Sequence, residues 1–560
     1  MAADGFRKFL TPNSKSIFLN PCTEQEVMKY CQEVKSKKSH GSDEVSLCVM
    51  KGCIHLIASH VAAMINEMFV TGIFPSPLKL AKITPVYKSG NNKLFSNYRP
   101  ISVLNAFSKL YEKAICSRLT SFLEKNRLLA KNQFGFRKAH SPWMAIDRLL
   151  EMVHSSWENG DNVIGIFIDI RKAFDCVDFD ILLSKLEILG VRGVANSLMQ
   201  SYLKGRKHCV SFKNANSSWR DVSCGVPQGS ILGPLLFLVY INDICVASEN
   251  FNSILFADDT TLLIKGKDVD AIIEKANAGL EDNNRWCICN KLCLNCDKSH
   301  WILFNKDKSR LHSKPISIGS APIKEVSSVK FLGITIDSNL KWKSQLQSVA
   351  NHLSNFTGVF AKLRRSVPLQ TLKILYNSFV LSQLHYGLLL WGGSNLSMVS
   401  TAQNKLLRST VSKTVKCHMD PLYSMMGTLK VSDLYTNELR KLAFAAKNNL
   451  LPDHLNKKLI SNQVLPRTRS EANGDLLVDE ALPSKSLWHQ AAKTWNEMDK
   501  NLKLKQVSKA TFASNSKSDI LQHYKDFACD NSDCFVCDEV PLLHAVMPLT
   551  RIGPHLFDEV

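Results

Sequence analysis

The sequence lacks the features that direct a chain into or across a membrane. The first ten residues contain no apolar core of the kind that a secretion signal needs. The longest apolar run that we find, Ile231–Ile241, is shorter than the roughly 20 residues that span a bilayer. Without a secretory signal, the 17 cysteines are typical of reduced thiols rather than of a disulfide framework. We therefore expect an intracellular protein, in the nucleus, the cytoplasm or both, with no membrane partner.

Acidic residues are also in short supply. Lysine and arginine number 70 against 50 for aspartate and glutamate, so the formal net charge is +20. Such a surplus favours a polyanionic partner, either nucleic acid or an acidic membrane surface, and a basic surface that binds nothing is the alternative. The chain shows no repeat at solenoid spacing and no low-complexity tract. With 45% hydrophobic residues over 560 positions, it predicts two to four globular units.

Changes in the hydrophobic pattern divide the chain into four predicted parts. Residues 1–70 form an N-terminal helical extension, and residues 71–338 mix strands and helices. Residues 339–450 are predominantly helical, and the change of period marks a domain boundary near 340. Residues 451–560 form a C-terminal region of uncertain fold.

Two adjacent acids lie between two short apolar runs in Ser253–Ile264. The runs before Asp258 and after Asp259 predict two strands joined by a tight turn that carries both carboxylates. Like charges this close repel, and burial adds a desolvation cost, so the pair must be solvated, protonated or bound to cations. A solvated hairpin turn and a cation site both fit this stretch taken alone.

A third acid ends another predicted strand. Val163–Ile168 is a continuous apolar run, as expected for a strand buried on both faces, and Asp169 follows it directly. Carboxylates from different strands are what a two-metal site for nucleotidyl transfer requires. The Gly/Pro-rich loop Ser223–Pro234 allows backbone to approach a ligand closely. The three acids and this loop favour the cation site.

The motifs around these acids resemble those of reverse transcriptases, and in particular those of non-LTR retrotransposons of the jockey type. The likeness runs from about residue 17 to about residue 520. The segments that carry it, in the order of the family, are Asn97–Ser102, Gln133–Arg137, Phe167–Asp175, Gly225–Pro234, Tyr240–Asp243, Phe256–Asp259 and Phe331–Ile334. The resemblance implies an α+β right-hand polymerase: fingers and an antiparallel palm sheet with helices in residues 71–338, and a helical thumb-like region in residues 339–450.

The resemblance also implies roles for single residues. Asp169, Asp258 and Asp259 would bind two Mg²⁺ ions, with Mn²⁺ as a possible substitute. Phe174 matches the bulky gate that excludes a ribose 2′-hydroxyl, although a Phe is more often a core residue. Gln228 matches the residue that contacts the incoming nucleotide and the template.

Basic residues complete the implied site. Lys88 and Arg99 match positions that meet the triphosphate. Lys298 matches the lysine proposed to protonate the leaving pyrophosphate, and a surface ion pair is its alternative. The segment Phe331, Leu332 and Gly333 resembles the primer grip.

The expected function is RNA-directed DNA polymerisation, with an RNA template, a DNA primer and deoxynucleoside triphosphates as partners. Only some 16 residues precede the matching region, so we expect no N-terminal endonuclease domain of the kind that relatives carry. The alternative is a catalytically inactive, element-derived protein that binds nucleic acid. A group II intron maturase is disfavoured because we find no Cys/His-rich nuclease tail of the expected kind.

One further cluster lies at the C-terminus. Cys529, Cys534, Cys537 and His544 are residue types that suit zinc. Their spacing is not that of a standard zinc knuckle, so reduced thiols are the favoured interpretation.

Overall fold

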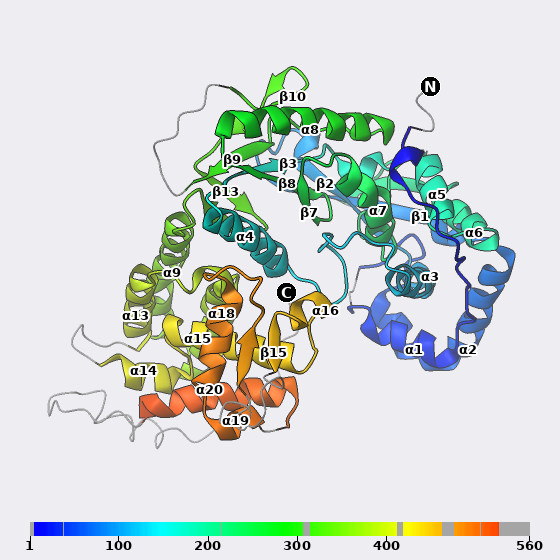
Figure 1. Ribbon diagram of the computed structural model, residues 1–560. Helices are drawn as coiled ribbons and strands as arrows, with labels where there is room; N and C mark the ends of the chain where they lie inside the picture. The colour runs from blue at the N-terminus through cyan, green and yellow to red at the C-terminus, as the bar shows by residue number, and fades with distance from the viewer. Residues whose placement is uncertain are drawn as a thin grey trace. The chain divides into compact units, whose positions relative to one another are not determined.

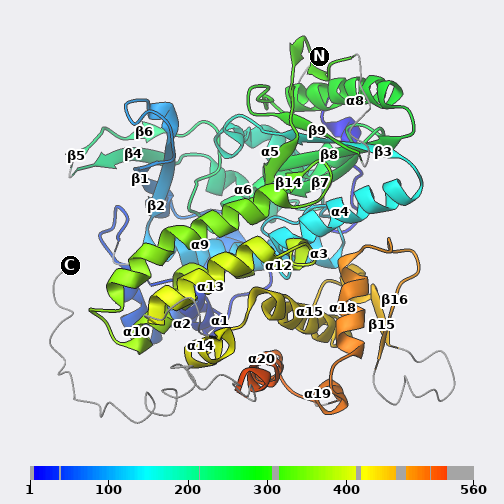
Figure 2. The same cartoon turned by 90° about the vertical axis from the view of Figure 1, so that its left-hand side faces the viewer.

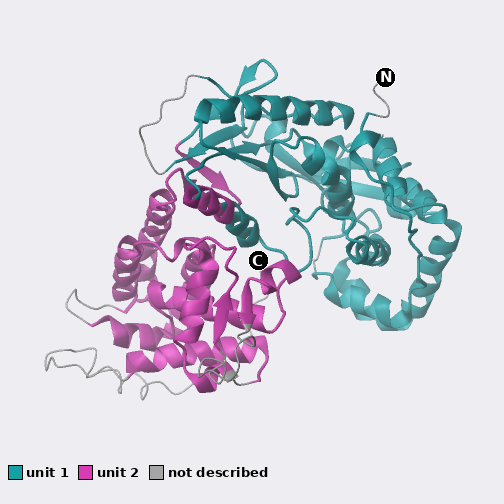
Figure 3. Cartoon of the chain, in the orientation of Figure 1, with its two compact units in different colours: residues 1–149, 159–326 teal, residues 150–158, 327–560 magenta. Residues whose placement is uncertain are grey.

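A computed structural model shows the chain as two units (Figure 3). Unit 1 comprises residues 1–149 and 159–326, and unit 2 comprises residues 150–158 and 327–560. Helix α4 (Pro142–Glu158) has residues in both. The structure describes residues 5–36, 39–213, 215–305, 314–411, 418–461, 475–504 and 506–525. The predicted four-part division of the chain stays a prediction.

A five-stranded sheet, called the central sheet, lies in unit 1 (Figure 1). Its strand order is β12 (Lys324–Glu325), β9 (His300–Phe304), β3 (Asn162–Ile168), β8 (Asp259–Gly266) and β7 (Asn252–Phe256). All neighbours are antiparallel except β12 and β9. Six of the seven residues of β3 are buried, so the predicted buried strand is confirmed. The predicted hairpin is confirmed as β7 and β8, with Phe256 paired to Asp259.

A second, outer sheet of unit 1 carries the loops that flank the central sheet. Its strands are β1 (Leu80–Tyr87), β2 (Tyr98–Leu104), β4 (Lys207–Phe212), β5 (Ala215–Asn216) and β6 (Arg220–Asp221). Strand β1 lies between β2, its antiparallel neighbour, and β4, its parallel neighbour. The backbone N–H of Ser102 donates to the carbonyl of Gln228 at 2.7 Å. This bond attaches the Gly/Pro-rich loop to strand β2.

The helices of unit 1 pack around the central sheet. They are α1 (Glu24–Glu33), α2 (Leu47–Thr71), α3 (Ala106–Lys125), α5 (Phe179–Ile188), α6 (Val194–Leu203), α7 (Gly233–Ile241) and α8 (Val269–Cys289). Their apolar faces, together with side chains of β3, β8 and β9, form one buried cluster. Helix α8 packs against β8 and lies along the central sheet in Figure 1. The hairpin β10 (Ser317–Ile318) and β11 (Ala321–Pro322) packs beside α8.

Helix α2 is longer than the helix that the hydrophobic pattern of the sequence predicts. Its 25 residues begin after Ser46, whose side chain accepts from the N–H of Val49, and end at Gly72, which adopts the left-handed conformation. In the sequence, apolar residues repeat at helical spacing only over roughly residues 53–69, which predicts a shorter helix. By length and composition α2 could cross a membrane, with a mean hydropathy of 1.6 over its most apolar stretch. One side of α2 is buried in the core of unit 1, through residues that include Met50 and Ile65.

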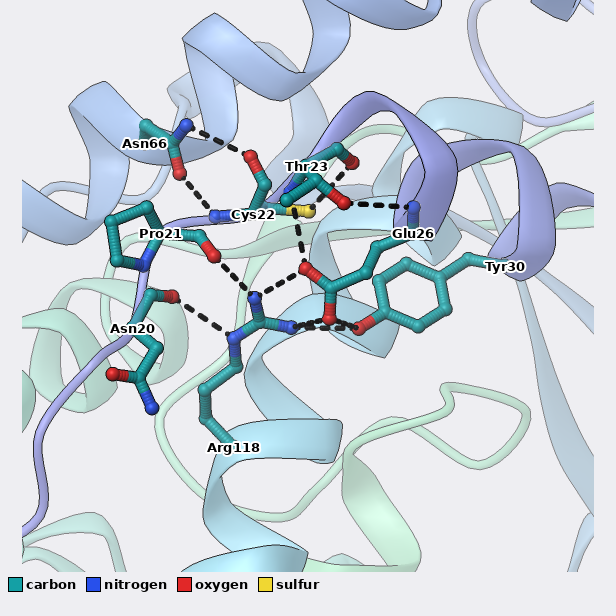
Figure 4. A network of polar contacts seen from close by, with 8 residues as sticks. All are labelled: Asn20, Pro21, Cys22, Thr23, Glu26, Tyr30, Asn66 and Arg118. Atoms are coloured by element: carbon teal, nitrogen blue, oxygen red, sulfur yellow. Dashed lines mark hydrogen bonds and ion pairs between the residues drawn. The ribbon is translucent and has the colours of Figure 1, made fainter.

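Arg118 of α3 joins the N-terminal segment to the helices of unit 1 (Figure 4). Its guanidinium donates to both carboxylate oxygens of Glu26, at 2.9 and 2.8 Å, and to the Tyr30 hydroxyl at 2.7 Å. It also donates to the carbonyls of Asn20 and Pro21. The Arg118 hydrogen bonds lower the pKa of Glu26 to about 2. The sequence Thr23–Glu26 has the Thr-x-x-Glu spacing that predicts a capping box at the start of α1, and the structure confirms it: the Thr23 and Glu26 side chains accept hydrogen bonds from each other's backbone N–H groups.

Unit 2 begins with a hairpin and continues mainly as helices. The hairpin strands are β13 (Ser328–Phe331) and β14 (Ile334–Asp337). The helices are α9 (Lys343–Leu363), α10 (Leu369–Tyr376), α11 (Ser382–His385), α12 (Leu388–Trp391), α13 (Ser397–Val411), α14 (Met419–Met426), α15 (Val431–Lys447), α16 (Asp453–Asn456), α18 (Leu487–Asn496), α19 (Lys500–Leu504) and α20 (Lys509–Lys525). A second hairpin joins β15 (Leu459–Ser461) to β16 (Leu476–Val478). Figure 2 shows α9 and α13 side by side.

Candidate active site

The three predicted acids lie at one edge of the central sheet. Asp169 follows the last residue of β3, and Asp259 opens β8. Because Ile168 pairs with Thr260 in the antiparallel ladder, the next pair along the two strands places Asp169 opposite Asp259. Asp258 lies in the turn between β7 and β8. The sheet register therefore brings together residues that are 90 positions apart in the sequence.

The acids act on one another electrostatically. Burial raises the pKa of Asp258, and the negative charge of Asp169 raises it further. The pKa of Asp259 is raised to about 6, first by desolvation and then by the charges of Asp258 and Asp169. The Asp259 residue as a whole is exposed, so the desolvation reflects the crowded turn around its carboxylate rather than full enclosure. The site holds negative charge that the protein leaves only partly compensated.

The turn that carries Asp258 is held in an uncommon conformation. Ala257 precedes the acids with a φ of 56°, in the left-handed region that costs a residue with a Cβ about 1 kcal/mol. The side-chain oxygen of Gln133 accepts from the N–H groups of Ala257, at 3.1 Å, and of Gly135, at 2.8 Å. A Cβ at Gly135 would lie 2.3 Å from the Ala257 nitrogen, so only glycine fits there. The sequence did not predict the hydrogen bond between Gln133 and Ala257, since these residues are 124 positions apart.

Asp169 is held by the segment that leads into β9. The amide of Asn295 donates to the Asp169 carboxylate at 2.7 Å, and the Asn295 N–H donates to the Asp169 carbonyl at 2.8 Å. The Ser299 hydroxyl accepts from the Asp169 N–H at 3.3 Å. Both partners are buried. An Asn in a turn before a predicted strand is the only sequence signal for this contact, and it is a weak one because asparagine is common in turns of every kind.

Two of the predicted basic residues lie near the acids. Lys88 follows β1 and Arg99 lies on β2, and both side chains are exposed. Their positive charges lower the pKa of Asp258 against the effect of burial. Lys298 is exposed in the turn three residues after Asn295, where its N–H donates to the Asn295 carbonyl.

Phe174 and Gln228 occupy neighbouring segments. The Phe174 ring stacks on Phe237 of α7, with centroids 4.3 Å apart, and meets the edge of Phe136 at 6.3 Å. It is only partly buried, so it is packed on one side and accessible on another. The Gln228 amide donates to the Asp175 carboxylate at 2.9 Å. The sequence pattern did not predict a role for Asp175.

Residues of two motifs named above, Gln133–Arg137 and Tyr240–Asp243, make contacts that stabilise unit 1. The Arg137 guanidinium donates to both carboxylate oxygens of Glu124, at 2.9 and 2.7 Å. This ion pair has a structural role. In the motif Tyr240–Asp243, the Asp243 carboxylate pairs with the buried ammonium of Lys185 at 2.5 Å and accepts from the Trp286 indole at 2.9 Å. The Arg137 guanidinium and the Asp243 carboxylate are therefore both engaged in contacts that stabilise the fold.

The predicted primer-grip residues form the turn of the β13–β14 hairpin in unit 2. Phe331 ends β13, and Leu332 and Gly333 both have positive φ values, of 47° and 82°. The Tyr386 hydroxyl donates to the Leu332 carbonyl at 2.6 Å. Within unit 2, the turn is thus held by the helical region that follows it.

The donor set at the sheet edge suits a hard cation. Carboxylate oxygens are the ligands that Mg²⁺ prefers, and bound cations would relieve the mutual repulsion that raises the Asp258 and Asp259 pKa values. Over the residues that the structure describes, no three His, Cys, Asp or Glu side chains are already gathered as a metal-binding group. The carboxylates would therefore need to turn toward a bound ion. The predicted zinc ligands, Cys529, Cys534, Cys537 and His544, lie outside the described residues.

Comparison with known proteins identifies the region around these acids. Residues 86–336 match the family described as reverse transcriptase (RNA-dependent DNA polymerase). The chain is 28% identical over 413 residues to the probable RNA-directed DNA polymerase from transposon BS of Drosophila melanogaster, covering 71% of this chain and 46% of that protein.

Two further relatives extend the match. The chain is 27% identical over 479 residues to the probable RNA-directed DNA polymerase from transposon X-element, with 80% of this chain and 52% of the relative covered. It is 27% identical over 478 residues to the RNA-directed DNA polymerase from mobile element jockey, with 82% and 51% covered. Both are from Drosophila melanogaster, and the chain spans about half the length of these relatives. Residues 86–336 thus match the reverse transcriptase family, and the chain is similar over most of its length to RNA-directed DNA polymerases of transposons and mobile elements.

Proposed function

We propose that this chain synthesises DNA on an RNA template by adding deoxynucleotides to the 3′-hydroxyl of a DNA primer. The observation that carries the proposal is the gathering of Asp169, Asp258 and Asp259 at one sheet edge, with the positive charges of Lys88 and Arg99 acting on the same site. The family match supports the reaction class. We place the activity inside the cell, in the nucleus or the cytoplasm.

The three carboxylates would hold two Mg²⁺ ions, and Mn²⁺ has the same ligand preferences. When bound, such ions activate the primer hydroxyl and neutralise charge that develops on the leaving pyrophosphate. Asn295 fixes the direction of the Asp169 carboxylate, and Gln133 fixes the turn that presents Asp258. Both supports favour catalysis because they hold the carboxylates in place before a substrate binds.

Other residues of the chain would bind and orient the substrate. Lys88 and Arg99 supply positive charge for the triphosphate, and Arg99 can bind phosphate oxygens in pairs. Lys298, exposed in the turn after Asn295, would donate a proton to the pyrophosphate. The accessible side of Phe174 would exclude a 2′-hydroxyl, and Gln228 would contact the incoming nucleotide.

On this proposal the right-hand architecture maps onto both units. The outer sheet with its loops corresponds to the fingers and the central sheet to the palm. The helices of residues 339–450 correspond to the thumb, and Phe331, Leu332 and Gly333 to the primer grip. The match of residues 86–336 to the family supports the first two assignments.

Primer extension tests the proposal. The full chain is incubated with poly-rA, an oligo-dT primer, dTTP and MgCl2, and extension is compared between the native chain and the Asp258→Asn variant. We expect extension by the native chain and a loss of at least about a thousandfold in the variant, because an amide cannot replace a carboxylate as a cation ligand. Asp180→Asn is the matched control, since Asp180 is exposed and its carboxylate pairs with Lys204 at the surface.

The alternative, an inactive protein that binds nucleic acid, gives a different result. Binding of the same template–primer, followed by fluorescence anisotropy, would then persist while the native chain shows no extension with either Mg²⁺ or Mn²⁺. That outcome would refute the proposed polymerase activity.

A further inference from the structure

Asp175 is the last residue of the motif Phe167–Asp175. Unlike Asp169 of the same motif, it has no metal-binding role in the proposed site. It lies in the short 3₁₀ turn Ala173–Cys176, directly after Phe174, and is partly buried. Its carboxylate accepts the hydrogen bond from the Gln228 side-chain nitrogen at 2.9 Å. Asp175 thus contacts the one glutamine that the proposed function assigns to the incoming nucleotide.

The hydrogen bond determines which way the Gln228 amide faces. An ionised carboxylate can only accept, so the group directed at Asp175 must be the NH₂ and not the carbonyl oxygen. The carbonyl oxygen then lies on the other side of the amide, where no described residue donates to it. Burial raises the pKa of Asp175, and the Gln228 bond and the charge of Lys172 act in the opposite direction. The hydrogen bond from Gln228 therefore stabilises the ionised form of Asp175, and the ionised form in turn strengthens the hydrogen bond.

The backbone on both sides of this bond is fixed as well. The N–H of Val226 donates to the Phe174 carbonyl at 2.9 Å, and the N–H of Gly225 donates to the Val177 carbonyl at 2.8 Å. Gly225 has a φ of 87°, and a Cβ there would lie 2.8 Å from the Asp175 carbonyl oxygen. The two segments are joined too closely for Gln228 to turn away from Asp175 by moving its loop.

Asp175 and Gln228 both line a cavity of about 260 Å³ in unit 1. Ile83 and Pro100 of the outer sheet also line it, and most of the surface of its wall is apolar. Its polar and charged side chains, among them Arg206 as well as Asp175 and Gln228, supply the groups that would orient a ligand. The unpaired carbonyl oxygen of Gln228 adjoins a space that a ligand can enter.

We propose that Asp175 is a positioning residue, which holds the Gln228 amide so that its carbonyl oxygen accepts a hydrogen bond from the incoming deoxynucleotide. The proposal rests on the proposed polymerase function. It makes Asp175 act on nucleotide binding and not on the chemical step, because Asp175 reaches the substrate only through Gln228.

A double-mutant cycle tests the proposal. Michaelis parameters for dTTP are measured on saturating poly-rA with an oligo-dT primer for the native chain, Asp175→Asn, Gln228→Met and the double variant. An Asn at 175 can donate as well as accept, so the Gln228 amide would face either way. We expect KM for dTTP to rise roughly tenfold in Gln228→Met, the loss of about one hydrogen bond, and about twofold in Asp175→Asn, where about half of the Gln228 amides face the wrong way; kcat should be nearly unchanged in both. In the double variant KM should rise no further than in Gln228→Met alone.

Controls separate this role from a structural one. Asp180→Asn should leave both parameters unchanged, and thermal unfolding shows whether each variant folds; if Asp175→Asn does not, Asp175→Ser takes its place in the cycle. An unchanged KM in a folded variant at 175 would refute the proposal, and so would effects that multiply in the double variant or a weaker template–primer affinity at constant KM. Absence of extension by the native chain would instead refute the proposed function.

Discussion

At the scale of single residues, the acid site gives up stability for function. Asp259 carries a carboxylate whose pKa is raised to about 6 by desolvation and by the charges of Asp258 and Asp169. A raised pKa of an acid means that its ionised form destabilises the folded state above that pH. Asp259→Asn removes one of the repelling charges. In EDTA at pH 7.5, we expect the variant to unfold a few degrees above the native chain.

The same variant should lose its response to magnesium. Adding 10 mM MgCl2 should raise the Tm of the native chain, because an ion that binds only the folded state stabilises it. The rise should be much smaller for Asp259→Asn and unchanged for Asp180→Asn, measured by differential scanning fluorimetry. Equal rises in all three proteins would contradict a cation site at Asp259.

The residues that hold the acids were harder to predict than the acids themselves. Asp169 and Asp258 end or follow apolar runs, and a charge in such a setting is visible in the sequence. Gln133 and Asn295 are polar residues in loops, where polar residues are common. Their importance comes only from partners more than 120 positions away, and a single sequence does not show such pairs.

At the scale of secondary-structure elements, Arg118 fastens α1 and the segment before it to α3. Its guanidinium is nearly buried and serves five acceptor atoms. Removing it leaves a partly buried Glu26 carboxylate without its partner. We expect Arg118→Met to lower the free energy of unfolding of unit 1 by about 2–3 kcal/mol, measured by urea denaturation at pH 7. Lys113→Met is the matched control: its pair with Glu33 joins the same two helices at the surface and should contribute less than about 1 kcal/mol.

The contribution of Arg118 should depend on pH in one direction. The pKa of Glu26 is lowered from 4.5 to about 2, so its stabilising effect is complete above pH 4.5 and is lost as the pH falls toward 2. The difference between the native chain and Arg118→Met should therefore shrink between pH 5 and pH 3. A constant difference over that range would show that the side chain acts through packing alone.

Elements differ in how far the sequence predicted them. Strand β3 and the β7–β8 hairpin follow from apolar runs bounded by polar turns. Helix α8 follows from Ile272, Ala276 and Leu280, whose spacing in the sequence predicts a helix over residues 269–289. The strands β4, β5 and β6 are short and exposed, with partners in β1 or in each other, so they lack that signal. Helix α2 was predicted too short because the exposed face of its first turns breaks the apolar period.

At the scale of the whole molecule, the charge of +20 is the feature that bears on affinity. Each phosphate that lysine or arginine neutralises releases a counterion, so affinity for nucleic acid falls with salt. We expect a plot of log Kobs against log [KCl] for a template–primer duplex to have a slope of about −5, corresponding to roughly six phosphate contacts. Asp258→Asn should give a slope within one unit of this value, and a slope near zero would contradict electrostatic binding.

The fold class followed from the sequence, and its finer organisation did not. The resemblance to reverse transcriptases implied an α+β chain, and the structure has mixed helices and strands. The sequence analysis left residues 451–560 without a predicted fold, although the buried residues of α18, among them Trp488 and Trp495, and those of α20 recur at helical spacing. Sequence periodicity reports local structure, and these elements are stabilised by contacts with α15, which lies earlier in the chain.

The strand order of the central sheet has a consequence for how the protein is made. Strand β3 lies between β8 and β9, which follow it by about 90 and 130 residues, and both neighbours are needed before its edges are paired. Contacts this distant in sequence form slowly, and they form only after the later strands have left the ribosome. A nascent chain that ends before Phe304 therefore carries Asp169 at the end of an apolar strand with at least one unpaired edge. During synthesis this edge stays open until β9 has left the ribosome, and only then are the three acids and the Asn295 side chain that holds Asp169 all in place.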